Sequence, residues 1–229
     1  MPNITERLNS AINSIRFFEK KSQRVENSVE LIAVSKTKPI SDIEQAIAAG
    51  QRHFGENYVQ EGVEKVLHFD DSSLTWHFIG PLQSNKTRVV AENFDWIHTI
   101  DRLKIAKRLN EQRGVYQKPL QILIQVNISG EDSKSGLSPE EVMALAVQLA
   151  KFDRLTLRGL MTIGIKTDDL SVINEQFDKM HQLLQQLKKE FDTVDTLSMG
   201  MSSDIEQAIG NGSTMVRIGS AIFGARAPK

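Results

Sequence analysis

The sequence predicts a (β/α)₈ barrel, an α/β fold of the TIM type, preceded by an extra N-terminal helix. Eight short apolar runs typical of strands alternate with amphipathic segments along the 229 residues. The connections are short, and no Pro-, Gly- or Ser-rich gap divides the chain, so we expect one domain over residues 1–229. An open doubly wound sheet shows the same alternation. The count of eight strands favours the barrel, because closure removes both sheet edges.

The first elements follow from spacing and from turn residues. A lead-in helix is predicted within residues 1–25, where Ile4, Leu8, Ile12, Ile15 and Phe18 recur at helical spacing. The apolar run that begins at residue 31 predicts the first strand, and it ends at a lysine shortly before a proline.

The next helix is predicted over residues 41–50. Ser41 and Glu44 have the spacing of a capping box, and Gly50 is the expected stop. The pattern then repeats, with strands predicted at 53–57, 76–80, 96–101, 121–127, 155–164, 196–201 and 215–224. Helices are predicted at 59–69, 84–94, 102–114, 139–152, 171–191 and 204–212, and Ser138 followed by Pro139 marks the start of one of them.

Charge balance, cysteine content and hydropathy exclude several classes of protein function. The 28 basic and 29 acidic residues are nearly balanced, which argues against nucleic acid as a partner. The absence of cysteine excludes disulfides and thiolate metal sites and fits a reducing compartment. The start of the sequence lacks the apolar segment of a signal peptide, and no apolar run approaches a membrane span. We therefore expect a cytoplasmic protein without a membrane partner.

Lys36 stands at the end of the first predicted strand, in the stretch LIAVSKTKP at residues 31–39. Because side chains alternate along a strand, Lys36 shares a face with Ile32 and Val34, and we expect that face to be the core. Burial disfavours an ammonium and leaves a neutral amine that can form an imine with an aldehyde. The competing interpretation is a lysine whose charged end reaches solvent at a strand terminus.

A phosphate site is expected after the last two strands. In such barrels a phosphate is often bound there by amides at the start of a short helix. SMGMSSD at 198–204 places Gly200 beside Ser202 and Ser203, and RIGSA at 217–221 places Gly219 beside Ser220. Taken singly, each serine is more typical of a helix cap and each glycine of a turn, but two such sets on adjacent strands indicate a ligand.

Arg217 shares a face of the eighth predicted strand with Gly219, so it is expected to point into the barrel, where it needs an anion or an acceptor. It could pair with a carboxylate or with the ring nitrogen of a bound heteroaromatic. The first strand lies beside the eighth in a closed barrel, and Lys36 and Arg217 together indicate a pyridoxal phosphate site. Lys36 would bind the aldehyde carbon and Arg217 the pyridine nitrogen, with the phosphate at Ser202, Gly219 and Ser220.

The other candidates are weaker. His53, His77 and His98 fall on successive strands, but they lack an HExxH pairing or a carboxylate at ligand spacing, so we expect hydrogen-bonded histidines and no metal. Asn57 follows the second strand and could reach a ligand in the barrel mouth or cap a helix. GEDSKSG at 130–136 lacks the spacing of a Walker loop or a dinucleotide fingerprint, and is either a lid or a solvated loop.

Five segments resemble the pyridoxal phosphate homeostasis proteins, also called PROSC or YggS-like proteins: AVSKTKP, HFGENYVQE, WHFIGPLQSNK, SMGMSSD and VRIGSAIFGAR, within residues 33–226. The resemblance implies a barrel similar to the N-terminal domain of alanine racemase, with the cofactor on Lys36. It also implies phosphate contacts at Ser202, Gly219 and Ser220, a ring-nitrogen partner at Arg217 and a weaker ring contact at Asn57. No role is carried over to Ser203.

The family implies a carrier of pyridoxal phosphate in vitamin B6 homeostasis, expected to be a monomer, with pyridoxal phosphate-dependent apoenzymes as candidate recipients. Related racemases use a tyrosine from an added domain and a second subunit, and neither Tyr58 nor Tyr116 lies in a matching motif. The prediction therefore leans away from an enzyme and assigns no catalytic residue. A weak amino-acid racemase and a phosphosugar-binding barrel stay open as alternatives.

Overall fold

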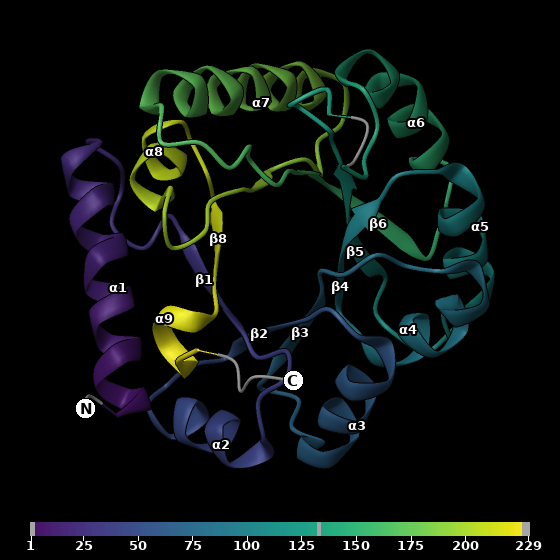
Figure 1. The fold of residues 1–229 in the computed structure, drawn as a ribbon. Coiled ribbons are helices and arrows are strands. Elements are labelled where there is room, and N and C mark those ends of the chain that lie inside the picture. Colours follow the sequence, from purple (N-terminus) through teal and green to yellow (C-terminus); the bar gives the residue numbers. More distant parts are fainter. Residues whose placement is uncertain (1–2, 132–133, 226–229) are drawn as a thin grey trace.

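Eight parallel strands form a closed barrel in the computed structural model, which describes residues 3–131 and 134–225 (Figure 1). Each strand pairs with the next along the chain, and β8 pairs with β1, so the predicted barrel is confirmed and the open doubly wound sheet is wrong. The strands are β1 Glu30–Val34, β2 His53–Glu56, β3 Thr75–Phe78, β4 Trp96–Ile100, β5 Leu120–Gln125, β6 Leu155–Met161, β7 Thr196–Ser198 and β8 Met215–Ile218.

Helices surround the barrel, and α1 packs outside this ring against α2, α8 and α9 (Figure 1). The helices are α1 Ile4–Lys21, α2 Ile40–Ala48, α3 Val59–Phe69, η1 Ser84–Lys86, α4 Thr87–Asn93, α5 Leu103–Gln112, η2 Pro139–Glu141, α6 Val142–Leu149, α7 Leu170–Glu190, α8 Ile205–Gly210 and α9 Ser220–Phe223. None of the helices in the described part of the chain is long and apolar enough to cross a bilayer.

Two helices show how far the local sequence determines the residue at which a helix begins. At Ser138 the predicted start is confirmed, and a capping box forms with Glu141. The capping box predicted at Ser41 is wrong, because α2 begins one residue earlier, at Ile40, and Pro39 is its N-cap. Pro39 has a φ of −68° and an extended ψ of 161°, and it makes no side-chain hydrogen bond to the helix start. The fixed φ of proline therefore sets the direction in which the chain enters the helix.

Both strands that flank the barrel closure are shorter than predicted. β1 ends at Val34, so Lys36 lies in the turn beyond it. The segment predicted as a strand over 215–224 divides at Gly219, after which α9 begins. Ile222 and Phe223 are buried in this short helix, which packs against α1. Tertiary packing therefore overrides an apolar run that locally resembles a strand.

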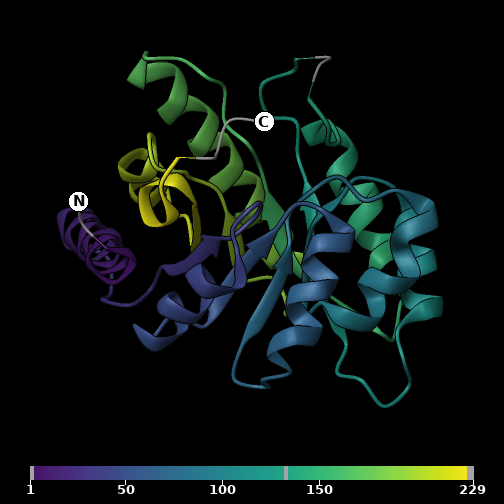
Figure 2. The same cartoon turned by 60° about the horizontal axis from the view of Figure 1, so that its bottom comes forward.

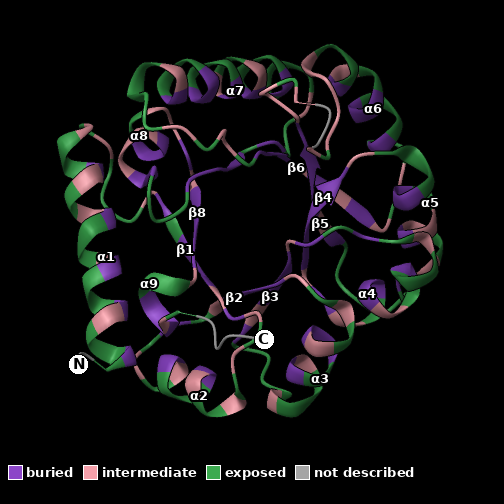
Figure 3. Cartoon of the chain, viewed as in Figure 1, coloured by how far each residue is buried: buried purple, intermediate pink, exposed green. Residues whose placement is uncertain are grey.

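The apolar core has two parts. The larger part fills the space between the strands and the inner faces of the helices, which are buried while their outer faces are exposed (Figure 3). The smaller part lies inside the barrel and consists of Ile32, Trp96, Leu123, Met161 and Met215. Because strand residues alternate between these two environments, the side chains that share a face with Ile32 point into the barrel.

The carboxyl ends of the strands form one mouth of the barrel. Figure 2 shows α9 and the segment that follows β5 at this end, and the loop that precedes β3 at the opposite end. In barrels of this type, side chains that bind ligands come from the loops at the carboxyl ends of the strands. The predicted site residues are therefore expected at this mouth.

Candidate functional site

Lys36 lies partly buried in a turn whose two neighbours are fixed. Before it, the buried Ser35 hydroxyl donates a hydrogen bond to Oε1 of Glu56 at 2.6 Å. After it, Thr37 adopts a left-handed φ of 62°, and its backbone N–H donates to Oε1 of Glu61 at 2.5 Å. This unusual backbone conformation persists only where the surroundings specify it. The position of the Lys36 backbone is thus set from both sides.

A buried ammonium joins these contacts. Nζ of Lys65, whose residue is 4% exposed, donates to the Ser35 carbonyl at 2.7 Å, to Oε1 of Glu56 at 2.8 Å and to Oε1 of Glu61 at 2.6 Å. Burial raises the pKa of Glu56, and the charge of Lys65 opposes that rise. The second carboxylate oxygen, Oε2 of Glu56, is buried without a hydrogen-bond partner among the described residues. We call Glu56, Glu61 and Lys65 the ionic cluster.

The ionic cluster was not predicted from the sequence. Charged residues on an amphipathic helix usually face solvent, and α3 places Lys65 inward instead. A signal was present, because Glu61 and Lys65 have the i, i+4 spacing of a helical ion pair and Glu56 ends the preceding strand. Nothing in that spacing indicates that Lys65 is buried and bonded to the carbonyl of Ser35, the residue before Lys36.

Lys38 is the second lysine of the AVSKTKP stretch, and it has a structural role. Its Nζ donates to the carbonyl oxygens of Phe223, Gly224 and Ala225 at 3.0, 3.1 and 3.0 Å. These carbonyls lie at the C-terminal end of α9, where a cation is favoured. Lys38 therefore ties the loop after β1 to the segment after β8, which leaves Lys36 as the candidate for chemistry in this stretch.

Arg217 points into the barrel, as predicted. It lies opposite Ile32 in the pairing of β8 with β1 and is 6% exposed. Its Nη1 donates to Oγ of Ser198 at 2.7 Å, and its Nη2 donates to the carbonyl oxygen of Thr162 at 2.8 Å. Burial lowers the pKa of Arg217 to about 10 and the charge of Asp204 opposes this, so the guanidinium is still a cation at neutral pH.

The loop between β7 and α8 depends on Gly200. This residue has a φ of 99°, and a Cβ there would lie 2.5 Å from Cβ of Ala208. Only glycine therefore allows α8 to pack so closely against the loop. Ser202 and Ser203 are exposed in the turn that leads into α8. Beyond β8, a Cβ on Gly219 would lie 3.2 Å from the carbonyl oxygen of Val34, so the start of α9 borders the end of β1.

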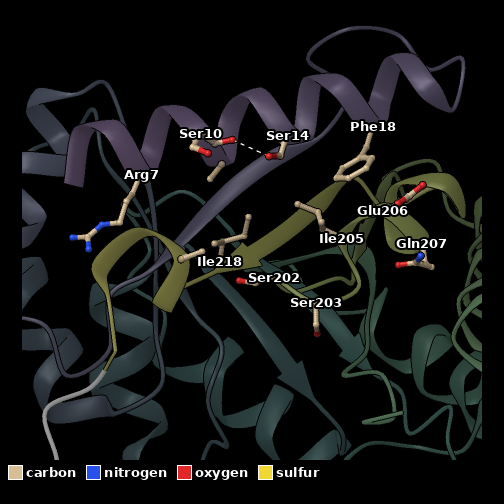
Figure 4. A pocket seen from close by; sticks show the side chains of 12 residues that line it. Arg7, Ser10, Ser14, Phe18, Ser202, Ser203, Ile205, Glu206, Gln207 and Ile218 are labelled. Carbon is tan, nitrogen blue, oxygen red and sulfur yellow. Dashed lines mark hydrogen bonds between the residues drawn. The ribbon is translucent and has the colours of Figure 1, made fainter. Parts of the chain in front are cut away.

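Helix α1 forms one wall of a groove that reaches this loop (Figure 4). The groove has a volume of about 390 Å³, and Ser202, Ser203 and Ile218 lie on the wall opposite Arg7 and Ser10. Ser202 therefore borders the same cavity as the end of β8. The contribution of α1 to the surroundings of this loop was not predicted from the sequence.

Asn57 borders the other side of the mouth. It lines a cavity of about 270 Å³, and its Oδ1 is buried without a hydrogen-bond partner among the described residues. The backbone is crowded there, because a Cβ on Gly80 would lie only 2.0 Å from the carbonyl oxygen of Asn57. An acceptor left unpaired at a cavity wall is available to a bound molecule. The same cavity is lined by Thr99, Gln125, Asn127, Lys134 and Ser135.

The segment 130–136, predicted to be either a lid or a solvated loop, is described only in part. Residues 132 and 133 lie outside the described residues. Nζ of Lys134 donates to the carbonyl oxygen of Gly164 at 3.2 Å and pairs with Glu131 at 3.0 Å. These contacts connect the end of this loop to the segment after β6.

The three histidines on successive strands bond to one another. The hydrogen-bonded nitrogens of His53 and His77 are 3.0 Å apart, and those of His77 and His98 are 2.9 Å apart. No cluster able to bind a metal ion occurs among residues 3–131 and 134–225. The histidines are hydrogen-bonded to one another, as predicted.

The residues at the mouth fit the chemistry of pyridoxal phosphate. That molecule presents an aldehyde, a phosphate dianion and a pyridine nitrogen, and it requires an amine, an anion site and a ring-nitrogen partner. A lysine follows β1, a glycine-serine turn begins α9 beside it, and a buried cation lies on the neighbouring strand. The unpaired oxygen of Asn57 adds an acceptor at the rim.

Comparison with known proteins places the chain in a family. A family model described as the N-terminal domain of alanine racemase matches residues 16–227. The pyridoxal phosphate homeostasis protein of Pasteurella multocida is 56% identical over 227 residues, which cover 97% of each chain. The chain belongs to the pyridoxal phosphate homeostasis protein family. The resemblance found in the sequence is therefore confirmed.

Solved structures extend this relation. The family relative PipY of Synechococcus elongatus, solved with PLP bound, is 37% identical with a TM-score of 0.82, covering 97% of this chain and 100% of that one. Alanine racemase of Corynebacterium glutamicum has a TM-score of 0.72 at 17% identity, covering 95% of this chain and 62% of that one. The second similarity shows that the two proteins share the barrel fold.

Proposed function

We propose that this protein binds pyridoxal 5′-phosphate as an imine on Lys36 and takes part in intracellular vitamin B6 homeostasis. The observation that carries the proposal is the pairing of β1 with β8, which brings the Lys36 turn, the start of α9 and Arg217 together. The membership of the family and the PLP bound in the structure of PipY support the same cofactor.

Each candidate residue has a distinct task in this proposal. The Lys36 amine would hold the aldehyde carbon, with loss of its oxygen as water, and Ser202, Gly219 and Ser220 would bind the phosphate. Asn57 contacts the ring with its unpaired oxygen. When bound, the cofactor supplies an electrophilic carbon joined to a ring that can accept electrons.

Arg217 would limit the chemistry of the bound cofactor. A guanidinium only donates hydrogen bonds, so it binds the pyridine nitrogen in its unprotonated form. The unprotonated ring withdraws electrons weakly, which disfavours carbanion chemistry. A site built in this way sequesters the aldehyde without efficient turnover.

The tyrosines support a carrier over the alternative, an amino-acid racemase. Racemisation needs a second proton carrier opposite the lysine. Tyr58 is 51% exposed at the start of α3, and Tyr116 is fully exposed in the connection from α5 to β5, at the far end of the barrel from the mouth. Tyr116 is therefore too far from the mouth to supply a proton to a molecule held at Arg217, and Tyr58 exposes half of its surface to solvent. We assign no catalytic residue.

Further parts of the proposal concern assembly and exchange. We infer that residues 1–229 act as one barrel domain and that the protein is a cytoplasmic monomer. Apoenzymes that use pyridoxal phosphate are the proposed recipients. Mixing the loaded protein with such an apoenzyme, and measuring recovered enzyme activity, tests that transfer.

The imine is tested by absorbance and by trapping. Wild-type protein with added pyridoxal phosphate is expected to show an imine band, and borohydride reduction should fix the cofactor on Lys36, located by peptide mass spectrometry. Lys36→Ala should lose both signals. Lys38→Ala is the matched control and should retain both. Reduced cofactor on a different lysine of the wild type would contradict the assignment.

The racemase alternative has its own measurement. The loaded protein is incubated with alanine or serine enantiomers in D₂O, and deuterium at Cα is followed by NMR. We expect no exchange above the rate of free pyridoxal phosphate. Rapid exchange that depends on Lys36 would favour an enzyme.

A further inference from the structure

A chain of hydrogen bonds runs through the barrel interior from Arg217. Nη1 of Arg217 bonds Oγ of Ser198 at 2.7 Å, and this oxygen bonds Nδ1 of His98 at 3.0 Å. Nε2 of His98 lies 2.9 Å from Nδ1 of His77, and Nε2 of His77 lies 3.0 Å from Nδ1 of His53. We call His53, His77 and His98 the histidine relay.

The register of the strands explains how the relay forms. His53 is the first residue of β2, and His77 of β3 lies opposite Gly55, two residues further along β2. His77 in turn lies opposite Trp96, and His98 follows Trp96 by two residues on β4. Each histidine of the relay therefore lies two register positions nearer the carboxyl ends of the strands than the one before it. The relay runs from the amino ends of the strands toward Arg217.

Arginine fixes the direction of the first bond in the chain. A guanidinium only donates, so Oγ of Ser198 accepts from Arg217, and the Ser198 hydroxyl still has its own hydrogen to donate to Nδ1 of His98. Each imidazole that accepts at Nδ1 carries its hydrogen on Nε2 and donates to the next ring. At the outer end, the N–H of His53 faces Oε2 of Glu30 at 3.9 Å. With Ser198 as the donor to His98, all donors in the chain point away from Arg217.

The two inner rings are neutral. His77 and His98 have no exposed surface. Burial lowers the pKa of both well below the usual value, His98 and His53 add to the effect on His77, and Arg217 adds to the effect on His98. Neutral imidazoles are what the one-way pattern of donors requires.

Arg217 has no ion-pair partner within the described residues, and Asp204 acts on it only at longer range. A buried cation without such a partner needs another source of stabilisation. The imidazole rings of the relay supply aligned dipoles, and the lone pair of each Nδ1 is turned toward the guanidinium. Hydrogen bonds in such a chain polarise one another, which strengthens the chain. A carboxylate in this place would neutralise the cation, whereas dipoles leave its charge intact.

We propose that the histidine relay is a positioning device for Arg217, which orients the guanidinium through Ser198 and leaves its full positive charge for the ring nitrogen of bound pyridoxal phosphate. This inference rests on the proposed function, because it concerns how the same site binds the ring. The relay also connects the site to Glu30 and His53 at the opposite end of the barrel. His53 is the partly exposed member, with a side chain 27% exposed.

The protonation pattern can be measured without the cofactor. Two-bond ¹H–¹⁵N correlation spectra of the wild-type protein distinguish the two neutral tautomers from the charged imidazolium. We expect the Nε2–H tautomer for all three relay histidines at pH 7.5. A Nδ1–H tautomer or an imidazolium at His77 or His98 overturns the proposal. The charged groups near the relay are Glu30 at its outer end, Arg217 and Asp204 at its inner end, and Arg158 over the Trp96 ring that stacks on His77.

The cofactor end is tested with His77→Phe, which keeps an aromatic ring against Trp96 and removes both nitrogens. We expect about tenfold weaker binding of pyridoxal phosphate, the loss that follows from a weakened hydrogen bond to a charged group. With cofactor labelled at the ring ¹⁵N, the chemical shift should move toward the protonated pyridine. The imine band itself should persist, because Lys36 is untouched.

Two further variants make the result decisive. His53→Gln at the partly exposed end should fold normally and should shift the ¹⁵N signals of His77. His68→Gln, in an exposed position on α3 outside the relay, should change neither affinity nor spectra. The proposal fails if His77→Phe leaves the ring-nitrogen chemical shift unchanged and the affinity within twofold of wild type. It also fails if His53→Gln leaves the ¹⁵N signals of His77 unchanged. Absence of an imine band in the wild-type protein would instead contradict the proposed function.

Discussion

Lys38 donates to the carbonyl oxygen of Gly224 at 3.1 Å and thereby joins the loop after β1 to the end of α9. The contact spans 186 residues of sequence and lies beside the closure of the barrel. It also separates two lysines that stand two positions apart in the chain. Lys38 fixes the two loops to each other, while the neighbours of Lys36, Ser35 and Thr37, are bonded to the ionic cluster.

Replacement of Lys38 should loosen the loop without removing the imine. Lys38→Met loses three hydrogen bonds from a charged donor, and we expect the free energy of unfolding to fall by about 1 to 2 kcal/mol. Urea unfolding measures this change. Borohydride trapping should still find the cofactor on Lys36. Loss of trapping in a folded Lys38→Met protein would show that the roles of the two lysines are misassigned.

The ionic cluster should be the most sensitive part of the Lys36 turn. Lys65→Met leaves the buried Glu56 carboxylate without its cation, and we expect a loss of about 3 to 5 kcal/mol. The double variant Lys65→Met with Glu56→Gln should recover much of this, because the carboxylate that remains, Glu61, is partly exposed to solvent. Chemical denaturation of both variants measures the difference.

A matched control for Lys65→Met lies on α7. Lys179 pairs with Glu175 at 2.7 Å with the same i, i+4 spacing, but both side chains are exposed. Lys179→Met should change stability little, since surface ion pairs contribute little. Equal effects at Lys65 and Lys179 would contradict a structural role for the cluster.

The site illustrates what a sequence can and cannot reveal. The alternation of side chains on a strand correctly oriented Arg217, because that rule depends only on local geometry. The inward turn of Lys65 depends on how α3 packs over β2, which no local pattern encodes. The same holds for α9, where the burial of Ile222 and Phe223 against α1 converts a strand-like run into a helix.

Acid should destabilise the protein through its buried histidines. The pKa values of His77 and His98 are lowered, so the stability that these rings contribute is present above their unfolded pKa near 6.5 and is lost as the pH falls. From pH 7.5 to 5.5 we expect a loss on the order of 3 kcal/mol for the two rings together. Urea unfolding across this range measures it.

His77→Phe provides the comparison for this pH dependence. With one buried titrating ring left, the loss over the same range should fall to about half of the wild-type value. An unchanged pH dependence in this variant would mean that other groups take up the protons on unfolding.

Gly80 should tolerate no side chain. A Cβ there would lie 2.0 Å from the carbonyl oxygen of Asn57, so Gly80→Ala must displace the backbone at the mouth. We expect a loss of about 3 kcal/mol in unfolding free energy, together with weaker cofactor binding. Gly114→Ala is the control, because the nearest atom is a flexible side-chain oxygen of Gln117 at 3.1 Å. Normal cofactor binding by Gly80→Ala would contradict the assignment of Asn57 to the cofactor site.

The histidine relay marks a second limit of prediction. The sequence identified hydrogen-bonded histidines on successive strands, because strand assignment alone shows that they are neighbours. Their connection through Ser198 to Arg217 was not predicted. It requires the stagger between strands, which is a property of the closed barrel and is absent from any single segment.

The closure of β1 against β8 also determines when the site can exist during synthesis. Residues 30–36 leave the ribosome early, but Arg217 and the start of α9 follow some 180 residues later. A growing chain can present the Lys36 amine long before the strand that completes its surroundings has been translated. Nascent chains should therefore gain the ability to capture a reactive aldehyde only in the last moments of translation.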